Sequence, residues 1–470
     1  MHKLSATELA QAIRTRRLSS LEAVEACFEQ ISRFDPTFKA FITLAPEQAR
    51  VAARAADRAV QAGLPLGCLH GVPIAIKDLT ATAGLRTTYG SLLYRDHVPT
   101  QDDLCVARLR AAGAIILGKT STPEFGMGTG THNSILGTTV NPHDQAKTCG
   151  DSSGGAAVAV ASGMAYLAQG TDMGGSVRTP ASFCGLVGLR PSQGRIPRWP
   201  KPLPWESLVT DGVMARTVED AALMLTAMAG VDYRDPTAIA TQTWPRPTFS
   251  SDGGPQTRIG YSLDLGVTPI ATEVAEVFEQ VIAAIAQVCP HTSPATIDCS
   301  GAKFAFETLR GAIVFHQYQS LLENHGDQLN ETLRWEIEQG QGVTAADYLK
   351  AEAQRGKIFN NFLDFFEQHD ILLTPSASVL PFPSTQTAVL DINGTALGNV
   401  VDYLAITYTL SLTGLPVVSI PCGWTQSGLP VGIQIVGPPQ AEAQMLQFAY
   451  FLQEQLGFRH RWPRPAMAGL

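Results

Sequence analysis

Two short apolar segments separated by a helical one restrict the fold of this chain more than any other feature. Residues 73–76 read Pro-Ile-Ala-Ile and residues 114–117 read Ala-Ile-Ile-Leu, while residues 103–112 have the pattern of a helix. Short apolar runs of this kind are typical of strands buried on both faces of a parallel sheet. Parallel strands need a crossover connection, which is usually a helix. The order strand, helix, strand therefore predicts an α/β fold.

Later segments predict more of the same architecture. Residues 154–162 are small and apolar all round, which predicts a helix buried on every side. Residues 166–170 are predicted to form a strand that runs into a glycine-rich turn. Beyond residue 200 the signals are weaker, but 303–369 is predicted to be mainly helical, and 371–374 and 417–420 are predicted strands.

The composition argues against several classes of protein. Charged residues make up 16% of the 470 residues and hydrophobic residues 45%, so a large buried core is expected and disorder is not. There are 42 Asp and Glu against 34 Lys and Arg, and the net charge of −8 argues against a nucleic-acid partner. The uncharged stretch 403–441 is interrupted by Gly-Leu-Pro and Pro-Pro, which predicts buried core and no membrane span.

The cysteines and the N-terminus indicate the compartment. The eight cysteines are scattered and form no C-x-x-C pair, which is typical of a protein from a reducing compartment. The first twenty residues are polar and contain no apolar segment of the kind that a secretory signal needs. We therefore expect a cytoplasmic protein with neither a nucleic-acid nor a membrane partner.

Two matches to ligand-binding motifs fail on their context. Residues 113–120 fit the phosphate-loop pattern G-x-x-x-x-G-K-T, but the predicted strand fills the four variable positions and no helix follows. Residues 126–130, Gly-Met-Gly-Thr-Gly, are one residue short of a dinucleotide fingerprint and follow no strand. The ten histidines show no metal-ligand spacing. We expect neither a cofactor nor a metal.

The serines offer better candidates for chemistry. Gly150-Asp-Ser152-Ser-Gly154 fits G-x-S-x-G, the nucleophile elbow of α/β-hydrolases. That elbow needs an apolar strand directly before it, and the preceding residues 141–149 are instead typical of a loop. The elbow interpretation is therefore weak, although the serine-rich turn still needs an explanation.

Lys77 and Ser176 are predicted to face one crevice. Lys77 ends the strand 73–76, and Ser176 lies just after the strand 166–170. Ligands bind beyond the carboxyl ends of strands in open parallel sheets. Burial at a strand end lowers the pKa of a lysine, and a neutral amine can act as a general base. The alternative for Lys77 is a surface lysine or an ion pair with Asp78.

The turn before Ser176 is suited to binding an oxyanion. Met173-Gly174-Gly175-Ser176 places consecutive glycines where backbone N–H groups can turn toward one point. The alternative is a tight turn without chemistry, because Gly-Gly-Ser is a common sequence.

Taken in order, these segments resemble the amidase signature family. Residues 71–78 (Gly-Val-Pro-Ile-Ala-Ile-Lys-Asp) resemble its lysine segment, and residues 152–155 (Ser-Ser-Gly-Gly) resemble its Gly/Ser-rich signature. Residues 171–178 (Thr-Asp-Met-Gly-Gly-Ser-Val-Arg), continuing to Pro191, resemble its nucleophile segment. Residues 413–421 add a weaker match near the C-terminus.

The resemblance implies a fold and a catalytic triad. The fold would be a single large α/β/α domain, residues 1–470, around a mixed, mostly parallel sheet. Its parts would be N-terminal helices (1–65), the signature core (66–200), a variable substrate-pocket region (201–400) and C-terminal core strands and a helix (401–470).

In the implied mechanism, Ser176 attacks an amide carbonyl and forms an acyl-enzyme. Ser152, held by a cis peptide bond, relays the proton to a neutral Lys77. The backbone N–H groups of Met173, Gly174, Gly175 and Ser176 hold the oxyanion.

The resemblance also assigns supporting roles. Gly126 and Met127, together with Ser152, would form the substrate-binding wall on the acyl side. Asp172 and Arg178 would form a buried pair that braces the nucleophile loop. One departure stands out, because the family usually has a second glycine where this chain has Asp151. A carboxylate there would favour the protonated form of the lysine.

Three functions remain open at this point. The first is an amidase acting on a small-molecule amide, an ester or a carbamate, with a homodimer left open. The second is the A-type subunit of a tRNA-dependent amidotransferase, for which the Tyr348 region is only a partial match. The third is an inactive binding protein.

The sequence does not identify the substrate. Aromatic residues in its variable regions could line a pocket, although core packing is expected for most of them. These residues are Trp199, Trp205, Phe304, Phe306 and Phe315.

Overall fold

The computed structural model describes residues 1–239, 249–250 and 254–463. The predicted pocket region (201–400) and C-terminal region (401–470) also include residues 240–248, 251–253 and 464–470, which lie outside the described residues.

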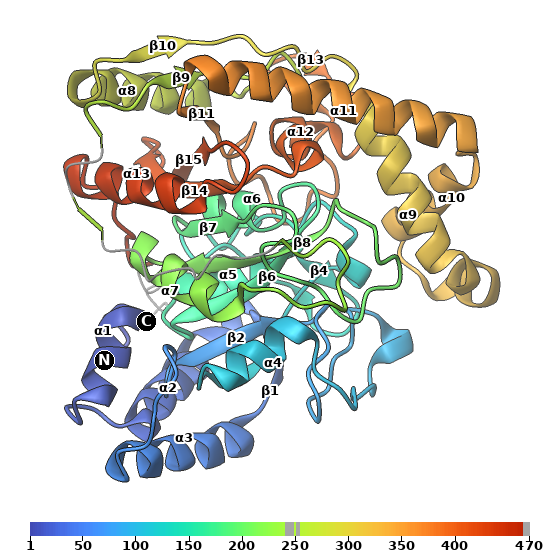
Figure 1. Ribbon diagram of the computed structural model, residues 1–470. Helices are drawn as coiled ribbons and strands as arrows, with labels where there is room; N and C mark the ends of the chain where they lie inside the picture. The colour runs from blue at the N-terminus through green and yellow to red at the C-terminus, as the bar shows by residue number, and fades with distance from the viewer. Residues whose placement is uncertain (240–248, 251–253, 464–470) are drawn as a thin grey trace.

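The described chain is built around one eleven-stranded sheet with helices packed against it (Figure 1). The strand order is β1-β3-β2-β6-β8-β7-β14-β15-β11-β9-β10. The strands of the sheet are β1 (Phe41–Leu44), β2 (Pro73–Lys77), β3 (Ile115–Thr120), β6 (Leu167–Asp172), β7 (Val187–Arg190), β8 (Thr210–Ala215), β9 (Ile259–Tyr261), β10 (Thr292–Pro294), β11 (Ile371–Pro375), β14 (Val417–Trp424) and β15 (Pro430–Val436). Two small hairpins lie outside it: β4 (His132–Asn133) with β5 (Gly137–Thr138), and β12 (Asp391–Ile392) with β13 (Thr395–Ala396).

The sheet is mixed, as predicted, but the prediction of a mostly parallel sheet is wrong. Parallel pairing is confined to β3-β2-β6 on one side and β11-β9-β10 on the other. The pairs between β6 and β11 are all antiparallel, as is β1 with β3. The predicted strand–helix–strand unit is parallel because a helix crosses over between its strands. In contrast, β14 and β15 are joined by a short turn, which permits only antiparallel pairing.

Helices pack in groups against this sheet. α5 and α6 contact each other and the central strands, and α7 and α13 contact each other and pack against β8 and β14. The helices are α1 (Ala6–Arg14), α2 (Ser20–Phe38), α3 (Pro46–Gln61), α4 (Leu104–Ala111), α5 (Gly154–Ala161), α6 (Arg178–Phe183), α7 (Val218–Met228), α8 (Thr272–Val288), α9 (Ala302–His325), α10 (Glu331–Gln341), α11 (Ala345–Gln368), α12 (Ala405–Thr413) and α13 (Glu442–Gln455).

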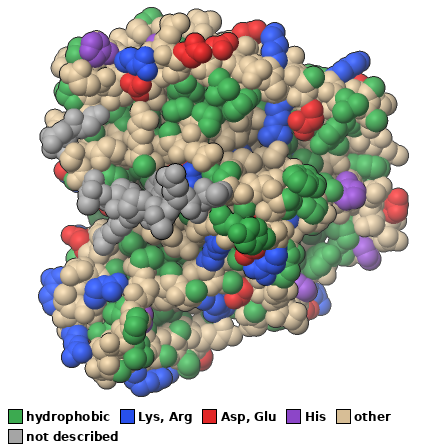
Figure 2. All heavy atoms as spheres, in the orientation of Figure 1, with side chains coloured by type: hydrophobic (Ala, Val, Ile, Leu, Met, Phe, Trp, Pro, Cys, Tyr) green, Lys and Arg blue, Asp and Glu red, His purple; other side chains and the backbone are tan. Residues whose placement is uncertain are grey.

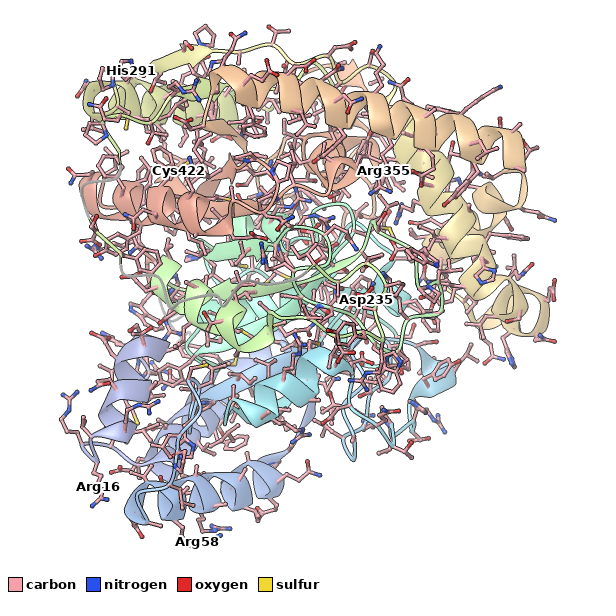
Figure 3. The ribbon with its side chains drawn as sticks, in the orientation of Figure 1. Arg16, Arg58, Asp235, His291, Arg355 and Cys422 are labelled. Atoms are coloured by element: carbon pink, nitrogen blue, oxygen red, sulfur yellow. The ribbon has the colours of Figure 1, made fainter. Side chains whose placement is uncertain are left out.

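The two ends of the molecule are formed by different helices. The N-terminal helices α1–α3 lie at one end and α11 at the other (Figure 1). Lys and Arg side chains gather over the N-terminal end in Figure 2. Arg16, labelled with Arg58 in Figure 3, donates to the Val60 carbonyl at 2.9 Å and so ties the turn after α1 to the last turn of α3.

One hydrophobic core cluster contains residues from Ala6 to Leu452, and the single sheet likewise draws strands from most of the chain. The assignment of residues 1–470 to one domain stays a prediction. No described helix is both long and apolar enough to cross a membrane. The uncharged stretch 403–441 forms α12, β14 and β15, whose residues are mostly buried, as predicted.

Most of the predicted local elements are confirmed. Residues 103–112 contain α4, and the predicted strand at 114–117 becomes β3, which occupies the apparent phosphate-loop motif. α5 has every residue buried, as its small apolar sequence predicts.

The parallel register of β2 with β6 positions the site. Ile76 pairs with Gln169, so the next residues of both strands reach the same edge of the sheet. Lys77 therefore leaves β2 beside the end of β6, and residues 173–177 carry the chain from that edge into α6.

The tight packing of α5 predicts that it will not accept a larger side chain. We expect Ala159→Leu, at a fully buried position, to lower the stability to urea by about 1–3 kcal/mol, because extra methylenes must displace packed neighbours. Circular dichroism during urea unfolding measures this. Ala55→Leu on the exposed face of α3 is the control, and equal effects would contradict the prediction.

Candidate active site

Lys77 lies at the centre of a cluster of hydroxyl groups. Its side chain is fully buried, and its Nζ is 2.7 Å from Ser152 Oγ, 2.8 Å from Ser153 Oγ and 2.9 Å from Thr171 Oγ1. Both alternatives for Lys77 are therefore wrong. It is not on the surface, and the carboxylate of Asp78 instead accepts hydrogen bonds from the Thr88 backbone and hydroxyl.

The surrounding hydrogen bonds orient the amine. Ser153 Oγ donates to the Thr171 carbonyl at 3.2 Å, so it accepts from Lys77. A neutral amine has two N–H groups. One can donate a hydrogen bond to Ser153 Oγ and the other to Thr171 Oγ1. In this form the third contact, with the Ser152 hydroxyl at 2.7 Å, is left for the lone pair of the nitrogen. This arrangement allows Lys77 to accept a proton from Ser152.

The environment of Lys77 favours this neutral form near neutral pH. Burial lowers the pKa of Lys77 to about 7, although the carboxylates of Asp172, Asp151 and Asp211 oppose the shift. A substantial fraction of the amine is therefore unprotonated at pH 7, which a solvated lysine does not achieve.

Ser152 stands in the turn that leads into α5, and its side chain lines a cavity. The predicted cis peptide bond at Ser152 is wrong, since the cis peptide bond found in the described chain is Trp199–Pro200. Residues 141–150 form a loop. The strand that the nucleophile-elbow interpretation requires directly before Ser152 is therefore missing.

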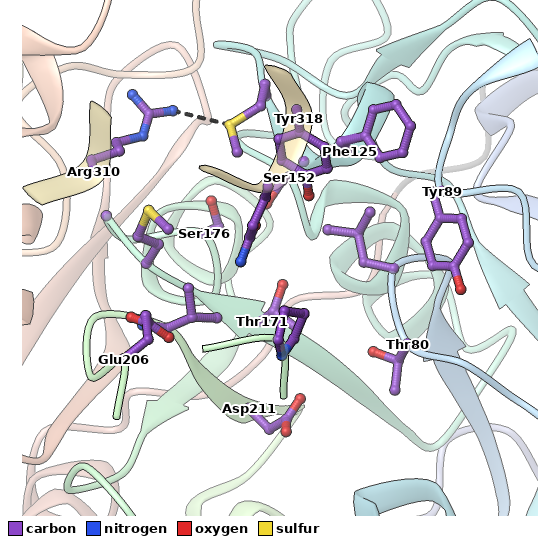
Figure 4. A pocket seen from close by; sticks show the side chains of 18 of the residues that line it. Thr80, Tyr89, Phe125, Ser152, Thr171, Ser176, Glu206, Asp211, Arg310 and Tyr318 are labelled. Atoms are coloured by element: carbon purple, nitrogen blue, oxygen red, sulfur yellow. Dashed lines mark hydrogen bonds between the residues drawn. The ribbon is translucent and has the colours of Figure 1, made fainter. Parts of the chain in front are cut away.

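Ser176 lines the same cavity from the loop between β6 and α6 (Figure 4). Within the described residues its hydroxyl makes no hydrogen bond, so it is free to meet a bound molecule. The sequence prediction that Lys77 and Ser176 serve one crevice is consistent with this placement, with Ser152 between the lysine and the cavity.

The oxyanion turn is only partly available for a ligand. The Gly175 N–H donates to Asp172 Oδ1 at 3.1 Å, so this group, predicted as an oxyanion donor, is already engaged. The N–H groups of Met173, Gly174 and Ser176 have no acceptor among the described residues. Gly175 is required for another reason: its φ is +127°, and a Cβ would lie 2.4 Å from Thr407 Oγ1.

Asp172 braces this turn from below. Its carboxylate accepts from Arg178 at 2.9 and 3.1 Å, from Arg190 at 3.1 Å and from the Val177 N–H at 3.1 Å. Asp172, Arg178 and Arg190 are fully buried. Burial would raise the pKa of Asp172, but the two guanidinium groups outweigh it and hold this pKa well below its usual value. The predicted Asp172–Arg178 pair is therefore buried, with Arg190 as an additional member.

The side chain of Asp151 is also buried, and it contacts Tyr403 in the interior of the protein. Tyr403 Oη donates to Asp151 Oδ1 at 2.6 Å, and Asp151 Oδ2 has no hydrogen-bond partner. Burial raises the pKa of Asp151 to about 6 against the hydrogen bond from Tyr403, so the side chain is mostly ionised at pH 7. It therefore acts on Lys77 as an additional negative charge, as its position in the sequence predicts.

The cavity has a volume of about 570 Å³. The predicted wall residues Gly126 and Met127 both line it, and a Cβ on Gly126 would lie 3.7 Å from Ser152 Oγ. Trp199 and Phe306 line it as well.

The other predicted aromatic residues do not line the cavity. Trp205 is 75% exposed and Phe304 42% exposed, so core packing is also wrong for these two. Phe315 packs against the small apolar cluster that contains Phe125 and Met127.

Four contributors to this site were not singled out from the sequence. Ser153 and Thr171 lie within the motifs themselves. Their hydroxyl groups, close in sequence to Ser152 and Ser176, could have identified them as partners of Lys77. Arg190 lies within the nucleophile segment. Tyr403 carries no local signal, because it reaches Asp151 from 252 positions away.

These features define a class of site: a serine beside a second serine that contacts a buried, partly neutral lysine. A family model for amidases matches residues 22–446. The chain belongs to the amidase family, also called the amidase signature family, and it is a hydrolase acting on carbon–nitrogen bonds.

Individual relatives agree with this assignment. The chain is 34% identical to an acylamidase of Rhodococcus erythropolis over 96% of this chain and 94% of the relative. It is 35% identical to the A-type subunit of a glutamyl-tRNA(Gln) amidotransferase from Moorella thermoacetica over the full length of both. The crystal structure of a bacterial aryl acylamidase superposes with a TM-score of 0.89 at 26% identity, covering 99% of both chains.

The buried charge of Asp172 yields a prediction about stability. We expect Asp172→Asn to cost about 3–5 kcal/mol of unfolding free energy, because Arg178 and Arg190 lose their buried counter-charge. Urea unfolding measures this. Asp96→Asn, which breaks the exposed pair with Arg95, is the matched control and should cost under about 1 kcal/mol. Similar losses in both variants would contradict the prediction.

The electrostatic effect of Asp151 on Lys77 yields a prediction about pH. Proton transfer to Lys77 needs the neutral amine, so labelling by a serine-reactive fluorophosphonate should increase with pH through about 7. An ionised Asp151 favours the ammonium form, so Asp151→Asn should lower the pKa of Lys77 and move this midpoint to lower pH. The labelling rate is measured from about pH 5 to about pH 9. Asp391→Asn, at an exposed position, is the control, and coincident profiles for all three proteins would refute the coupling.

Proposed function

We propose that this protein hydrolyses the C–N bond of small linear amides, with Ser176 as nucleophile, Ser152 as proton relay and Lys77 as base. The observation that carries this proposal is the 2.7 Å contact between Lys77 Nζ and Ser152 Oγ at the buried side of a cavity that Ser176 lines. A lysine with a pKa of about 7 in this position supports a role as base.

Acylation would begin with attack of Ser176 Oγ on the amide carbonyl carbon. The proton of Ser176 passes to Ser152 Oγ while the proton of Ser152 passes to Lys77 Nζ. The negative charge that develops on the carbonyl oxygen is stabilised by the unoccupied N–H groups of Met173, Gly174 and Ser176.

The proton then returns by the same route. Lys77 gives a proton to Ser152, and Ser152 gives its own to the leaving nitrogen, so that the C–N bond breaks and an amine departs. Water then adds to the acyl-enzyme and gives a proton through Ser152 to Lys77. The ester bond to Ser176 breaks, the acid departs, and the proton returns through Ser152 to Ser176 Oγ. No atom changes its oxidation state in this cycle.

A second candidate function is the A-type subunit of an amidotransferase, which the 35% identity over the full chain favours. Tyr348, the partial sequence match for this function, lies on α11 and does not line the cavity. Purification of the tagged chain from its own cells tests it: a stoichiometric protein partner would support the amidotransferase, and a chain that hydrolyses amides alone would support the amidase.

The triad assignment predicts a distinct set of variants. Ser176→Ala should abolish turnover and fluorophosphonate labelling, and Ser152→Ala and Lys77→Met should each lower the labelling rate by about 10³-fold or more. Ser300→Ala, at an exposed serine outside the cavity, is the control.

Labelling and mass spectrometry of the modified peptide measure these effects. Retained labelling in Ser176→Ala with complete loss in Ser152→Ala would make Ser152 the nucleophile instead. Absence of labelling in the unmodified protein would favour an inactive binding protein.

A further inference from the structure

The cavity is lined by more carboxylates than cations. The carboxylate-bearing residues are Asp103, Asp151, Glu206, Asp211 and Glu336, and the Lys and Arg residues are Arg198, Lys201 and Arg310. The described lining also contains one histidine, His316, which is exposed.

Each of these three bases already faces a carboxylate. Arg198 lies 3.6 Å from Glu206 and 3.7 Å from Asp211. Lys201 Nζ lies 3.7 Å from Asp235 (labelled in Figure 3).

Arg310 forms the shortest of these pairs, 2.6 Å from Glu336 Oε1. The described lining therefore offers a bound molecule no cation without a counter-charge.

Two of the lining carboxylates lack a cationic partner within the described chain. Asp103 accepts from the Ala81 N–H at 2.8 Å, and Asp151 accepts from Tyr403. Neither forms an ion pair there. The inner surface of the cavity is therefore negative overall, which is unfavourable for an anionic group.

The opposite part of the lining is aromatic. Phe125 lies with its ring centre 4.9 Å from that of Tyr318 and 6.4 Å from that of Tyr89. Figure 4 shows these three side chains on one side of Ser152 and the carboxylates of Glu206 and Asp211 on the other. An aromatic group has a flat apolar surface to pack against here.

We propose that the cavity accepts uncharged amides that carry an aromatic group and rejects amides that carry a carboxylate, free glutamine included. This inference rests on the proposed function, whose substrate class it narrows. A carboxylate that enters the cavity would lose its hydration without gaining a free cation. An uncharged amide loses much less hydration free energy on entering.

Glu336 is the residue that controls this selectivity on the acyl side. Its Oε1 accepts from Arg310 Nη2, while its Oε2 has no hydrogen-bond partner, and the side chain is 4% exposed. The same Nη2 contacts the sulfur of Met127 at 3.4 Å, in the predicted acyl wall (Figure 4). Removing the charge of Glu336 would leave Arg310 as a free cation beside that wall.

The test compares two substrates that differ only by a carboxylate. We expect kcat/KM for benzamide to exceed that for 4-carbamoylbenzoate at least about tenfold, since the carboxylate gains no free cation. Glu336→Gln should reduce this ratio about tenfold by freeing Arg310. Glu338→Gln, an exposed position on the same helix α10, should leave the ratio unchanged. Release of ammonia measures each reaction.

A substitution of Tyr318 tests whether an aromatic group of the substrate packs against the aromatic lining. Tyr318→Leu should lower kcat/KM for benzamide several-fold more than kcat/KM for acetamide, because acetamide has no ring to pack. Equal losses on both amides would overturn this part.

A binding measurement separates the two proposals. Calorimetry with Ser176→Ala compares benzamide with 4-carbamoylbenzoate without any turnover, and tighter binding of benzamide is expected. Equal or tighter binding of the carboxylate, or efficient hydrolysis of glutamine by the unmodified protein, would overturn the inference and leave the proposed function in place. Loss of all amide hydrolysis together with preferential benzamide binding would overturn the proposed function alone.

Discussion

The buried carboxylate of Asp172 is the interaction on which the candidate site depends. This carboxylate accepts hydrogen bonds from the N–H groups of Gly175 and Val177. It also accepts hydrogen bonds from the guanidinium groups of Arg178 and Arg190. A charge buried this deeply is tolerated only when it is fully paired, so the turn cannot rearrange without leaving charges unpaired. The same contacts fix which N–H groups remain free, and they keep Ser176 at the edge of the cavity.

A second balance governs Lys77. Burial removes water from its amine and favours the neutral form, whereas Asp151, Asp172 and Asp211 favour the charged form. Neither tendency alone would suit a base, because an isolated buried amine would hold a proton too weakly and a fully paired one too strongly. Asp151 is the adjustable member of this set, since its own burial keeps its pKa at about 6 and its charge sensitive to pH.

The cavity combines these features with a lining that limits its ligands. The carboxylates that pair with Arg198, Lys201 and Arg310 leave no free positive charge in the described lining. The aromatic rings supply apolar surface near the serines. The family includes an acylamidase and amidotransferase subunits alike, so we propose that the charges of the lining distinguish one substrate from another.

The sequence by itself determined the local elements and pointed to the three candidate catalytic residues. Burial of α5, the strands that carry Lys77 and precede Ser176, and the order of the three motifs all follow from short-range patterns, because helix and strand periodicities are local. Only the tertiary structure decided that most strand pairs are antiparallel, that the Gly175 N–H is already occupied and that Tyr403 binds Asp151 from 252 positions away. These contacts depend on which distant segments meet when the sheet assembles, and no local pattern in the chain specifies such meetings.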